Sequence, residues 1–102
     1  QDLEVVVTGM SSSPLKARTK GGIKHTTNEC MGMVKELKYK VDINTLHRIE
    51  GIDQIAMNDI GRISLRTSKP LFYDAYKKNR QTGSLIIIDE QTNETIGAGM
   101  II

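Results

Sequence analysis

The stretch MGMVKELKYKVDI, residues 31–43, predicts the fold class because apolar and polar side chains alternate along it. One face of the extended chain carries Met31, Met33, Leu37, Tyr39, Val41 and Ile43, and the other carries Glu36, Lys38, Lys40 and Asp42. Lys35 is the one interruption of the apolar face. A period of two is typical of a strand with one buried and one solvated face. We therefore expect a long strand in an antiparallel sheet, where such half-solvated strands are common.

The same alternation appears on either side of this stretch. Leu3, Val5 and Val7 share one parity near the start of the chain. Residues 60–67, IGRISLRT, place Ile63 and Leu65 opposite Arg62, Ser64 and Arg66. Residues 85–89, LIIID, are apolar on both faces, which predicts a strand deep in the sheet.

The last segment, TIGAGMII at residues 95–102, reads as a further strand. It places Ile96, Ala98, Met100 and Ile102 on one face and Gly97 and Gly99 on the other. Two glycines on one face indicate close approach by another backbone, or a bend. The preceding EQTNE, residues 90–94, predicts a turn in which Asn93 takes the positive φ that tight hairpins require.

Helical character is confined to YDAYKKN, which predicts one short helical turn near residues 73–79. Asp74 lies toward its start and Lys77 and Lys78 toward its end, as the helix dipole favours. Five or more antiparallel strands in 102 residues predict an all-β fold, a small closed antiparallel β-barrel. We expect residues 1–102 to form a single domain. Residues 11–22, with SSSP and RTKGG, are expected to be the most exposed and least structured loop.

The composition limits which partners, compartment and membrane association we expect for the chain. The net charge is +2, from 14 basic and 12 acidic residues, a mild excess that does not demand an anionic partner. The one cysteine, Cys30, cannot form an internal disulfide, so we expect the protein to lie in a reducing compartment such as the cytoplasm. We expect Cys30 itself to be buried as a small hydrophobic side chain. No apolar run approaches the roughly 18 residues of a membrane span. Because the sequence begins at Gln1 without methionine, we expect a piece excised from a longer chain.

Motifs that carry chemistry are missing from the sequence. There is no GxxxxGK[ST] loop and no GxGxxG loop, and His25, His47 and Cys30 do not have metal-ligand spacing. We predict no catalytic, cofactor-binding or metal-binding residue. Asp89 and Glu90 are compatible with acid–base work or, with at least equal strength, with capping a turn.

Two lysines raise the question of nucleic-acid binding. Lys38 and Lys40 share a face of the predicted strand and are compatible with phosphate contacts. Binders of single-stranded nucleic acid usually add aromatic stacking surfaces, and this chain has no tryptophan, one phenylalanine and three tyrosines. A solvated charged face is the favoured interpretation, so nucleic acid is an unlikely partner.

Five stretches resemble the carboxyl-terminal barrel of the large, GTP-binding subunit of sulfate adenylyltransferase (ATP sulfurylase). They are KHTT (24–27), YKVDINTL (39–46), NDIGRISL (58–65), PLFYDAYKKNRQTGSLIIID (70–89) and NETIGAGMI (93–101). That subunit is similar to elongation factor Tu and the alpha subunit of elongation factor 1, which share the TxGAG strand. The residues specific to the sulfate-activating branch are Asp42, Asn44, Thr45 and Leu46, with Asn79, Arg80, Thr82 and Gly83.

The resemblance implies a function for the longer parent protein. In such enzymes a small subunit joins ATP and sulfate into adenosine 5'-phosphosulfate and pyrophosphate, while GTP hydrolysis by the large subunit drives the step. GTP and magnesium are implied for the parent subunit and no cofactor for this piece, which lacks the phosphate loop, DxxG and NKxD elements. We expect a non-catalytic barrel that packs on the amino-terminal GTPase domain, the second barrel or the small catalytic subunit. In some relatives an adenylylsulfate kinase domain follows the barrel.

The segment KKNRQTG, residues 77–83, is implied to be a branch-specific connection. Gly83 would free the backbone at the turn, and Asn79 and Arg80 would tie down neighbouring segments. For Arg80 a contact with a partner protein is equally open. Two other functions are also open: the third domain of a translation elongation factor that binds tRNA, and a free-standing barrel with its own small ligand.

Overall fold

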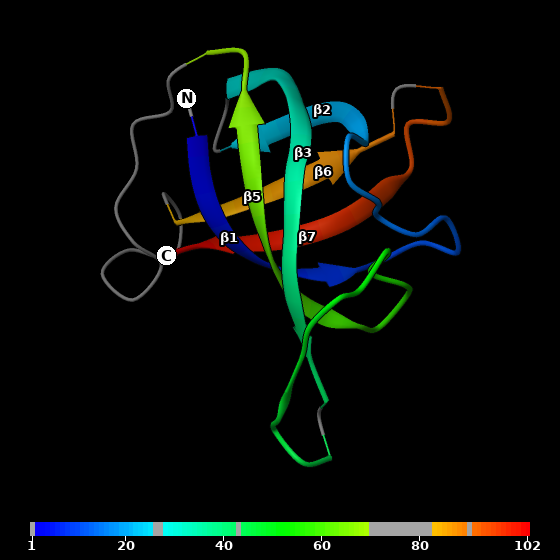
Figure 1. Cartoon of the computed structure of the whole chain (residues 1–102). Coiled ribbons are helices and arrows are strands. Elements are labelled where there is room, and N and C mark those ends of the chain that lie inside the picture. The colour runs from blue at the N-terminus through cyan, green and yellow to red at the C-terminus, as the bar shows by residue number, and fades with distance from the viewer. Residues whose placement is uncertain (1, 26–27, 43, 70–82, 90) are drawn as a thin grey trace.

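The computed structural model describes residues 2–25, 28–42, 44–69, 83–89 and 91–102, and the elements that these residues form are strands. The strands are β1 (Asp2–Gly9), β2 (Lys20–His25), β3 (Asn28–Val41), β4 (Arg48–Ile49), β5 (Ile60–Thr67), β6 (Ser84–Ile88) and β7 (Thr95–Ile101) (Figure 1). The helical turn predicted near residues 73–79 lies outside the described residues. Among those described, no helix is long and apolar enough to cross a membrane.

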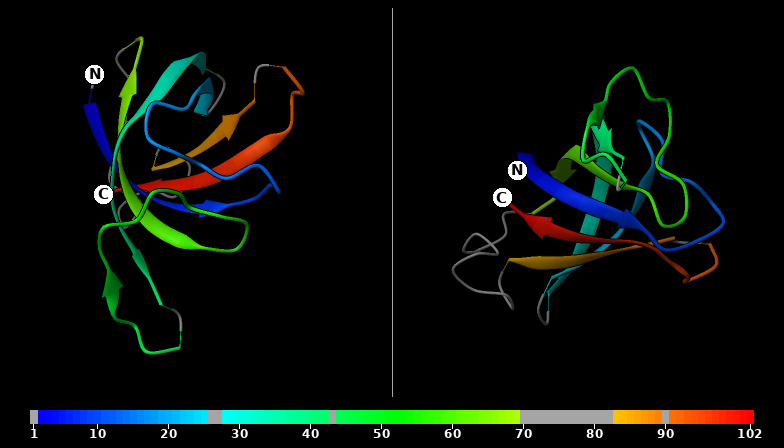
Figure 2. Two further views of the ribbon diagram at one scale, coloured as in Figure 1. Left: turned by 45° about the vertical axis from the view of Figure 1, so that its right-hand side comes forward. Right: turned by 90° about the horizontal axis from the view of Figure 1, so that it is seen from below.

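The strands form one sheet that closes on itself. Its order is β2-β6-β7-β1-β5-β3-β4, and an additional pairing of β2 with β3 joins the two sides (Figures 1 and 2). Every strand pair is antiparallel. The short strand β4 pairs only with the end of β3, and the segment around it projects from one end of the barrel. The predicted all-β closed antiparallel barrel is therefore confirmed.

The core lies inside the barrel and is built from alternate residues of the strands. Leu3, Val5 and Val7 of β1 are buried as predicted, and Val5 faces Ile63 of β5 in the register. Leu65 is also buried, while the residues between these positions point outward. The regular alternation in β1 and β5 identifies their buried faces directly.

Strand β3 does not keep one apolar face, so the face predicted for residues 31–43 is wrong before the first bulge and again after the second, where Tyr39 pairs with the outward-pointing Arg62. Val34 is buried and Met31 is 45% exposed. The pairing with β5 shifts twice, once between Val34 and Glu36 and once between Leu37 and Tyr39. Each β-bulge inserts one unpaired residue, Lys35 and then Lys38, and reverses which parity faces the core. Lys35 interrupts the apolar pattern because it is the first of these extra residues.

In β7 the inner face is the one that carries the glycines. A Cβ atom on Gly99 would lie 2.5 Å from Val5 Cγ1, so core side chains, rather than another backbone, occupy the space above it. Met100 points outward and is 39% exposed. The register with β6 shifts at Ile96, which has no partner residue in β6 and is buried.

Strand β6 is not buried on both faces as its sequence indicates. Leu85 and Ile87 are buried in the barrel, whereas Ile86 between them is 38% exposed on the outside. The prediction that residues 85–89 lie deep in the sheet holds for the inner face only.

The segment between β1 and β2 is more ordered than predicted. Leu15 is fully buried and exchanges two backbone hydrogen bonds with Ile55, at 2.9 and 2.8 Å. Ser11 is also buried, and its hydroxyl donates to the Glu94 carboxylate at 2.8 Å. Residues 20–22 belong to strand β2. The expectation of an exposed loop over residues 11–22 is therefore correct only in part: residues 12, 13 and 16–18 are exposed, whereas Ser11 and Leu15 cover one end of the core.

Candidate interaction surfaces

The described residues contain no group of three or more histidine, cysteine, aspartate or glutamate side chains that could hold a metal ion. His25 is buried in β2 and His47 is exposed, while Cys30 is half-buried and packs against the core. GTP and magnesium, which the resemblance implies for the parent subunit, do not fit a site among these residues, and the sequence has no phosphate loop.

A surface hollow of about 560 Å³ lies beside β2 and β3. Its lining mixes charges of both signs, with Lys24 and Lys69 balanced by Glu29 and Asp89. Ligand sites usually combine apolar and aromatic walls with a small number of placed polar groups. The described residues that line this hollow include no aromatic side chain.

The turn at residues 42–47 is held by its first residue. The Asp42 carboxylate accepts hydrogen bonds from the backbone N–H groups of Asn44 at 2.9 Å and Thr45 at 3.3 Å. The Asp42 carbonyl accepts from Leu46 N at 2.6 Å, and its N–H donates to the His47 carbonyl at 2.9 Å. Thr45 Oγ1 accepts from His47 N at 3.3 Å. Such side-chain bonds to the backbone two and three residues onward are what favours aspartate in turns.

Three of the predicted family-specific residues, Asp42, Asn44 and Thr45, therefore come together in one turn. Asp42 and Thr45 support its backbone through their side chains. A contact of these residues with a partner stays a prediction.

The turn at residues 89–94 repeats this arrangement. The Asp89 carboxylate accepts from Gln91 N at 2.8 Å and from Thr92 N at 3.3 Å. The Asp89 carbonyl accepts from Asn93 N at 2.9 Å, and its N–H donates to the Glu94 carbonyl at 2.9 Å. Asp89 therefore caps the turn, as one of its two interpretations predicted, and the Asn93 φ of 57° confirms the expected positive value.

The other predicted candidates lie around the start of β6. Gly83 is buried in a turn, and its carbonyl accepts a hydrogen bond from Ile101 N at 2.7 Å. Asn79, Arg80 and Thr82 lie outside the described residues, so their roles stay predictions.

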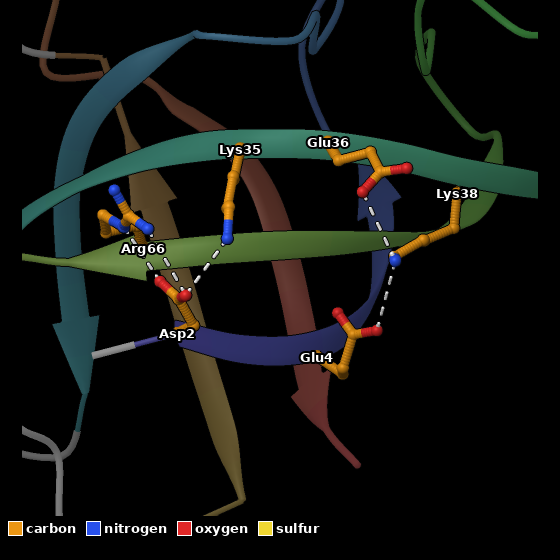
Figure 3. Close-up of polar contacts among 6 residues, drawn as sticks. All are labelled: Asp2, Glu4, Lys35, Glu36, Lys38 and Arg66. Atoms are coloured by element: carbon orange, nitrogen blue, oxygen red, sulfur yellow. Dashed lines mark hydrogen bonds and ion pairs between the residues drawn. The ribbon is translucent and has the colours of Figure 1, made fainter.

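A network of ion pairs covers the outer face of β1, β5 and β3 (Figure 3). Asp2 pairs with Arg66 at 2.9 Å and with Lys35 at 3.2 Å. Lys38 lies 3.3 Å from Glu36 and 3.9 Å from Glu4. Further pairs join Arg62 to Glu4 at 3.7 Å and Lys40 to Asp59 at 3.6 Å. Both extra lysines of the bulges thus reach across β5 to carboxylates on β1. Sequence reasoning missed these partners because they depend on the register of distant strands.

The charge partners of Asp2 shift its titration. Hydrogen bonds from Arg66 and then Lys35 lower the pKa of the Asp2 carboxyl from 3.8 to about 2, and the Asp2 carboxylate raises the pKa of Arg66 in return. Both side chains are about half exposed, so solvent and salt screen the pair.

Asp2→Asn is expected to lower stability above pH 4 and to have no effect near pH 1. The folded state lowers the Asp2 pKa, so its contribution is full above the unfolded value of 3.8 and is lost as the pH falls through about 2. Urea unfolding of the wild type and the variant between pH 1 and pH 6 measures the difference. A gap that stays constant with pH would show that the ion pair is not its cause.

The outer face of β6 and β7 is apolar and is not covered by described residues. Ile86 and Met100 are each more than a third exposed, and Ala98 lies between them in the register, opposite Ile86. Val6 of β1 pairs with Met100 and extends this face onto a third strand. The outer surface therefore includes a charged network and an apolar cluster, which Ser84 opposite Met100 and Lys24 opposite Ile86 border.

Comparison with known proteins identifies the barrel. The family described as GTP-eEF1A C-terminal domain-like matches residues 2–102. The chain belongs to this family. In fold, the barrel is similar to part of Sup35 complexed with GDP, with a TM-score of 0.85 at 13% sequence identity. That match covers 99% of this chain and 24% of Sup35.

Several relatives of the chain are named sulfate adenylyltransferase subunit 1. Sulfate adenylyltransferase subunit 1 of Francisella tularensis is 42% identical over 100 residues, which cover 98% of this chain and 21% of that protein. The subunit 1 of a Sulfurovum species is 38% identical over the same shares. The bifunctional enzyme CysN/CysC of Mycobacterium tuberculosis is 45% identical over 80 residues, or 78% of this chain and 13% of that protein. The predicted resemblance is confirmed, and the chain spans 13–21% of the length of these relatives.

Proposed function

We propose that the chain is the non-catalytic, carboxyl-terminal barrel of the large, GTP-binding subunit of a cytoplasmic sulfate adenylyltransferase. One observation carries the proposal: subunits 1 from three organisms are 37–42% identical to this chain over 98–100% of its length. The parent enzyme would form adenosine 5'-phosphosulfate and pyrophosphate from ATP and sulfate, driven by GTP hydrolysis.

The barrel's part in this reaction is structural. It offers two distinct outer surfaces, the ion-pair network on β1, β5 and β3 and the apolar face on β6, β7 and β1. An apolar face that the described residues leave uncovered is suited to packing against another domain. The GTPase domain, the second barrel and the small catalytic subunit are the partners through which the barrel would support the step.

A translation-factor role with tRNA is the alternative, and the outer face of β1, β5 and β3 weighs against a tRNA contact there. Lys35, Lys38, Lys40, Arg62 and Arg66 each lie within 4 Å of a carboxylate. Phosphate contacts would have to displace these carboxylates. Affinity for nucleic acid rests on neutralising phosphates with free cationic groups and falls steeply with salt.

The test begins with the reading frame upstream of Gln1, where a phosphate loop followed by DxxG and NKxD is expected. The full parent chain, purified with its small subunit, is expected to release pyrophosphate from ATP and sulfate several times faster with GTP than with GDP. A filter-binding assay with tRNA at 50 and 200 mM salt is the counter-test. A parent chain without GTPase elements, or one that binds tRNA and shows no GTP-dependent release, contradicts the proposal.

A further inference from the structure

Two turns of this barrel share one backbone arrangement and differ at one telling position. In both, the carboxylate of an aspartate accepts hydrogen bonds from the N–H groups two and three residues onward, and its carbonyl accepts from the N–H group four residues onward. The residue four positions after the aspartate has a positive φ. That residue is Asn93 in the β6–β7 turn, with φ 57°, and Leu46 in the β3–β4 turn, with φ 60°. The first is the residue type that the conformation favours, and the second is not.

The Leu46 side chain is not part of the hydrophobic core that the described residues form, so its burial does not compensate for the backbone conformation. Its side chain is 75% exposed, the largest exposure among the large apolar residues of the described chain. The turn does not need leucine, because Asp89 and Thr92 hold the same geometry around an asparagine. A costly conformation that presents an apolar side chain to water points to a function outside the barrel.

The surroundings of Leu46 define the kind of partner. We call residues 42–53 the β3–β4 arm; it projects from one end of the barrel (Figure 1). Ile49 on the same arm is 39% exposed. Glu50 and Asp53 are exposed and form no ion pair with another described residue.

The charge of the arm weighs against two classes of partner. It carries the carboxylates of Asp42, Glu50 and Asp53 against the one guanidinium of Arg48, which lies 4.6 Å above the Tyr39 ring. An acidic apolar arm is repelled by nucleic-acid phosphates and by anionic lipid headgroups. It complements an apolar protein pocket with basic side chains at its rim.

We propose that the β3–β4 arm is a docking element, in which Leu46 and Ile49 enter an apolar, basic-rimmed pocket on a second protein chain. Under the proposed function, on which this identification rests, that chain is the small catalytic subunit. The rigid turn presents Leu46 in a fixed position, which lowers the entropy cost of binding. Glu50 and Asp53 align the arm with the basic rim.

A reciprocal exchange of residues at the matched turns tests the proposal in the full parent chain. Leu46→Asn is expected to leave its thermal stability unchanged or higher, and to weaken binding of the small subunit by roughly tenfold or more. Asn93→Leu, the matched control, is expected to lower the unfolding temperature and leave the dissociation constant unchanged. Isothermal titration calorimetry and thermal unfolding give the two readouts.

A charge variant and a second residue type complete the test. Glu50→Lys with Asp53→Lys is expected to slow association with the small subunit, and added salt should shrink the difference. Leu46→Gly should reproduce the loss of affinity seen with asparagine. Wild-type affinity in both Leu46 variants would overturn the docking role while leaving the proposed function intact. No binding of the small subunit to the wild-type parent chain would overturn both.

Discussion

Alanine at position 9 is expected to destabilise the barrel by about 3 kcal/mol or more, the largest effect of any one-atom change considered. A Cβ atom on Gly9 would overlap the carbonyl oxygen of Ala56 and lie 2.8 Å from its carbonyl carbon. These are backbone atoms, so no side chain can move aside. Two backbone hydrogen bonds hold the two segments together: Gly9 N donates to the Asp59 carbonyl at 3.1 Å, and the Gly9 carbonyl accepts from Asn58 N at 2.9 Å. Urea unfolding followed by circular dichroism measures the loss.

Gly22→Ala is the matched control, since Gly22 is also a strand glycine. Its added Cβ would have Ile88 Cβ as nearest neighbour at 3.9 Å, an ordinary contact. The stability of this variant is expected to change by no more than about 0.5 kcal/mol, with a small gain from the reduced freedom of the unfolded chain. Equal losses in the two variants would show that the close approach of residues 9 and 56 is not what makes glycine necessary.

The sequence pattern predicts the inner faces of β1 and β5 because those strands pair without interruption. The alternation of residues 3–7 and 60–67 therefore reads directly as inside and outside. The same reasoning gives the wrong faces for strand β3, because the bulges at Lys35 and Lys38 change twice whether odd- or even-numbered residues face the core. A pattern with a period of two carries no signal for an inserted residue other than a polar side chain out of place.

The inner face of strand β7 cannot be assigned from its alternation, for a different reason. Its glycines face the core because the side chains of Val5, Val7, Leu15 and Leu85 fill the space above them. Hydropathy ranks the outward Met100 as a better core residue than Gly99, so periodicity alone assigns the faces in reverse. Only the packing of the closed barrel decides between them.

Turn chemistry is local, and it was predictable where it follows common preferences. The capping role of Asp89 and the positive φ of Asn93 follow from residue type. The matching conformation of Leu46 does not, because leucine rarely adopts it. The cross-strand pairs of Asp2 and Glu4 join residues more than 30 positions apart, and no local signal in the sequence predicts them.

Leu15→Ala is expected to cost about 3 kcal/mol, within the 2–5 kcal/mol typical of a fully buried leucine. The side chain is completely buried at one end of the core, and its Cδ1 atom lies 3.1 Å from the position that a Cβ on Gly97 would take. Alanine keeps both backbone hydrogen bonds to Ile55, so the loss reports the cavity rather than the pairing. Circular dichroism during urea unfolding measures the change in unfolding free energy.

Lys16→Ala provides the comparison, because Lys16 is the next residue along and is exposed. Its substitution is expected to change stability by no more than about 0.5 kcal/mol. The Leu15→Ala and Lys16→Ala variants together distinguish a loose surface loop from a packed end of the barrel at residues 11–19. If this segment were the loose surface loop that its serines and glycine-rich flank indicate, both variants would be neutral. If it closes the end of the barrel, as the burial of Leu15 requires, only the leucine variant loses stability, and the core extends beyond the strands that define the sheet.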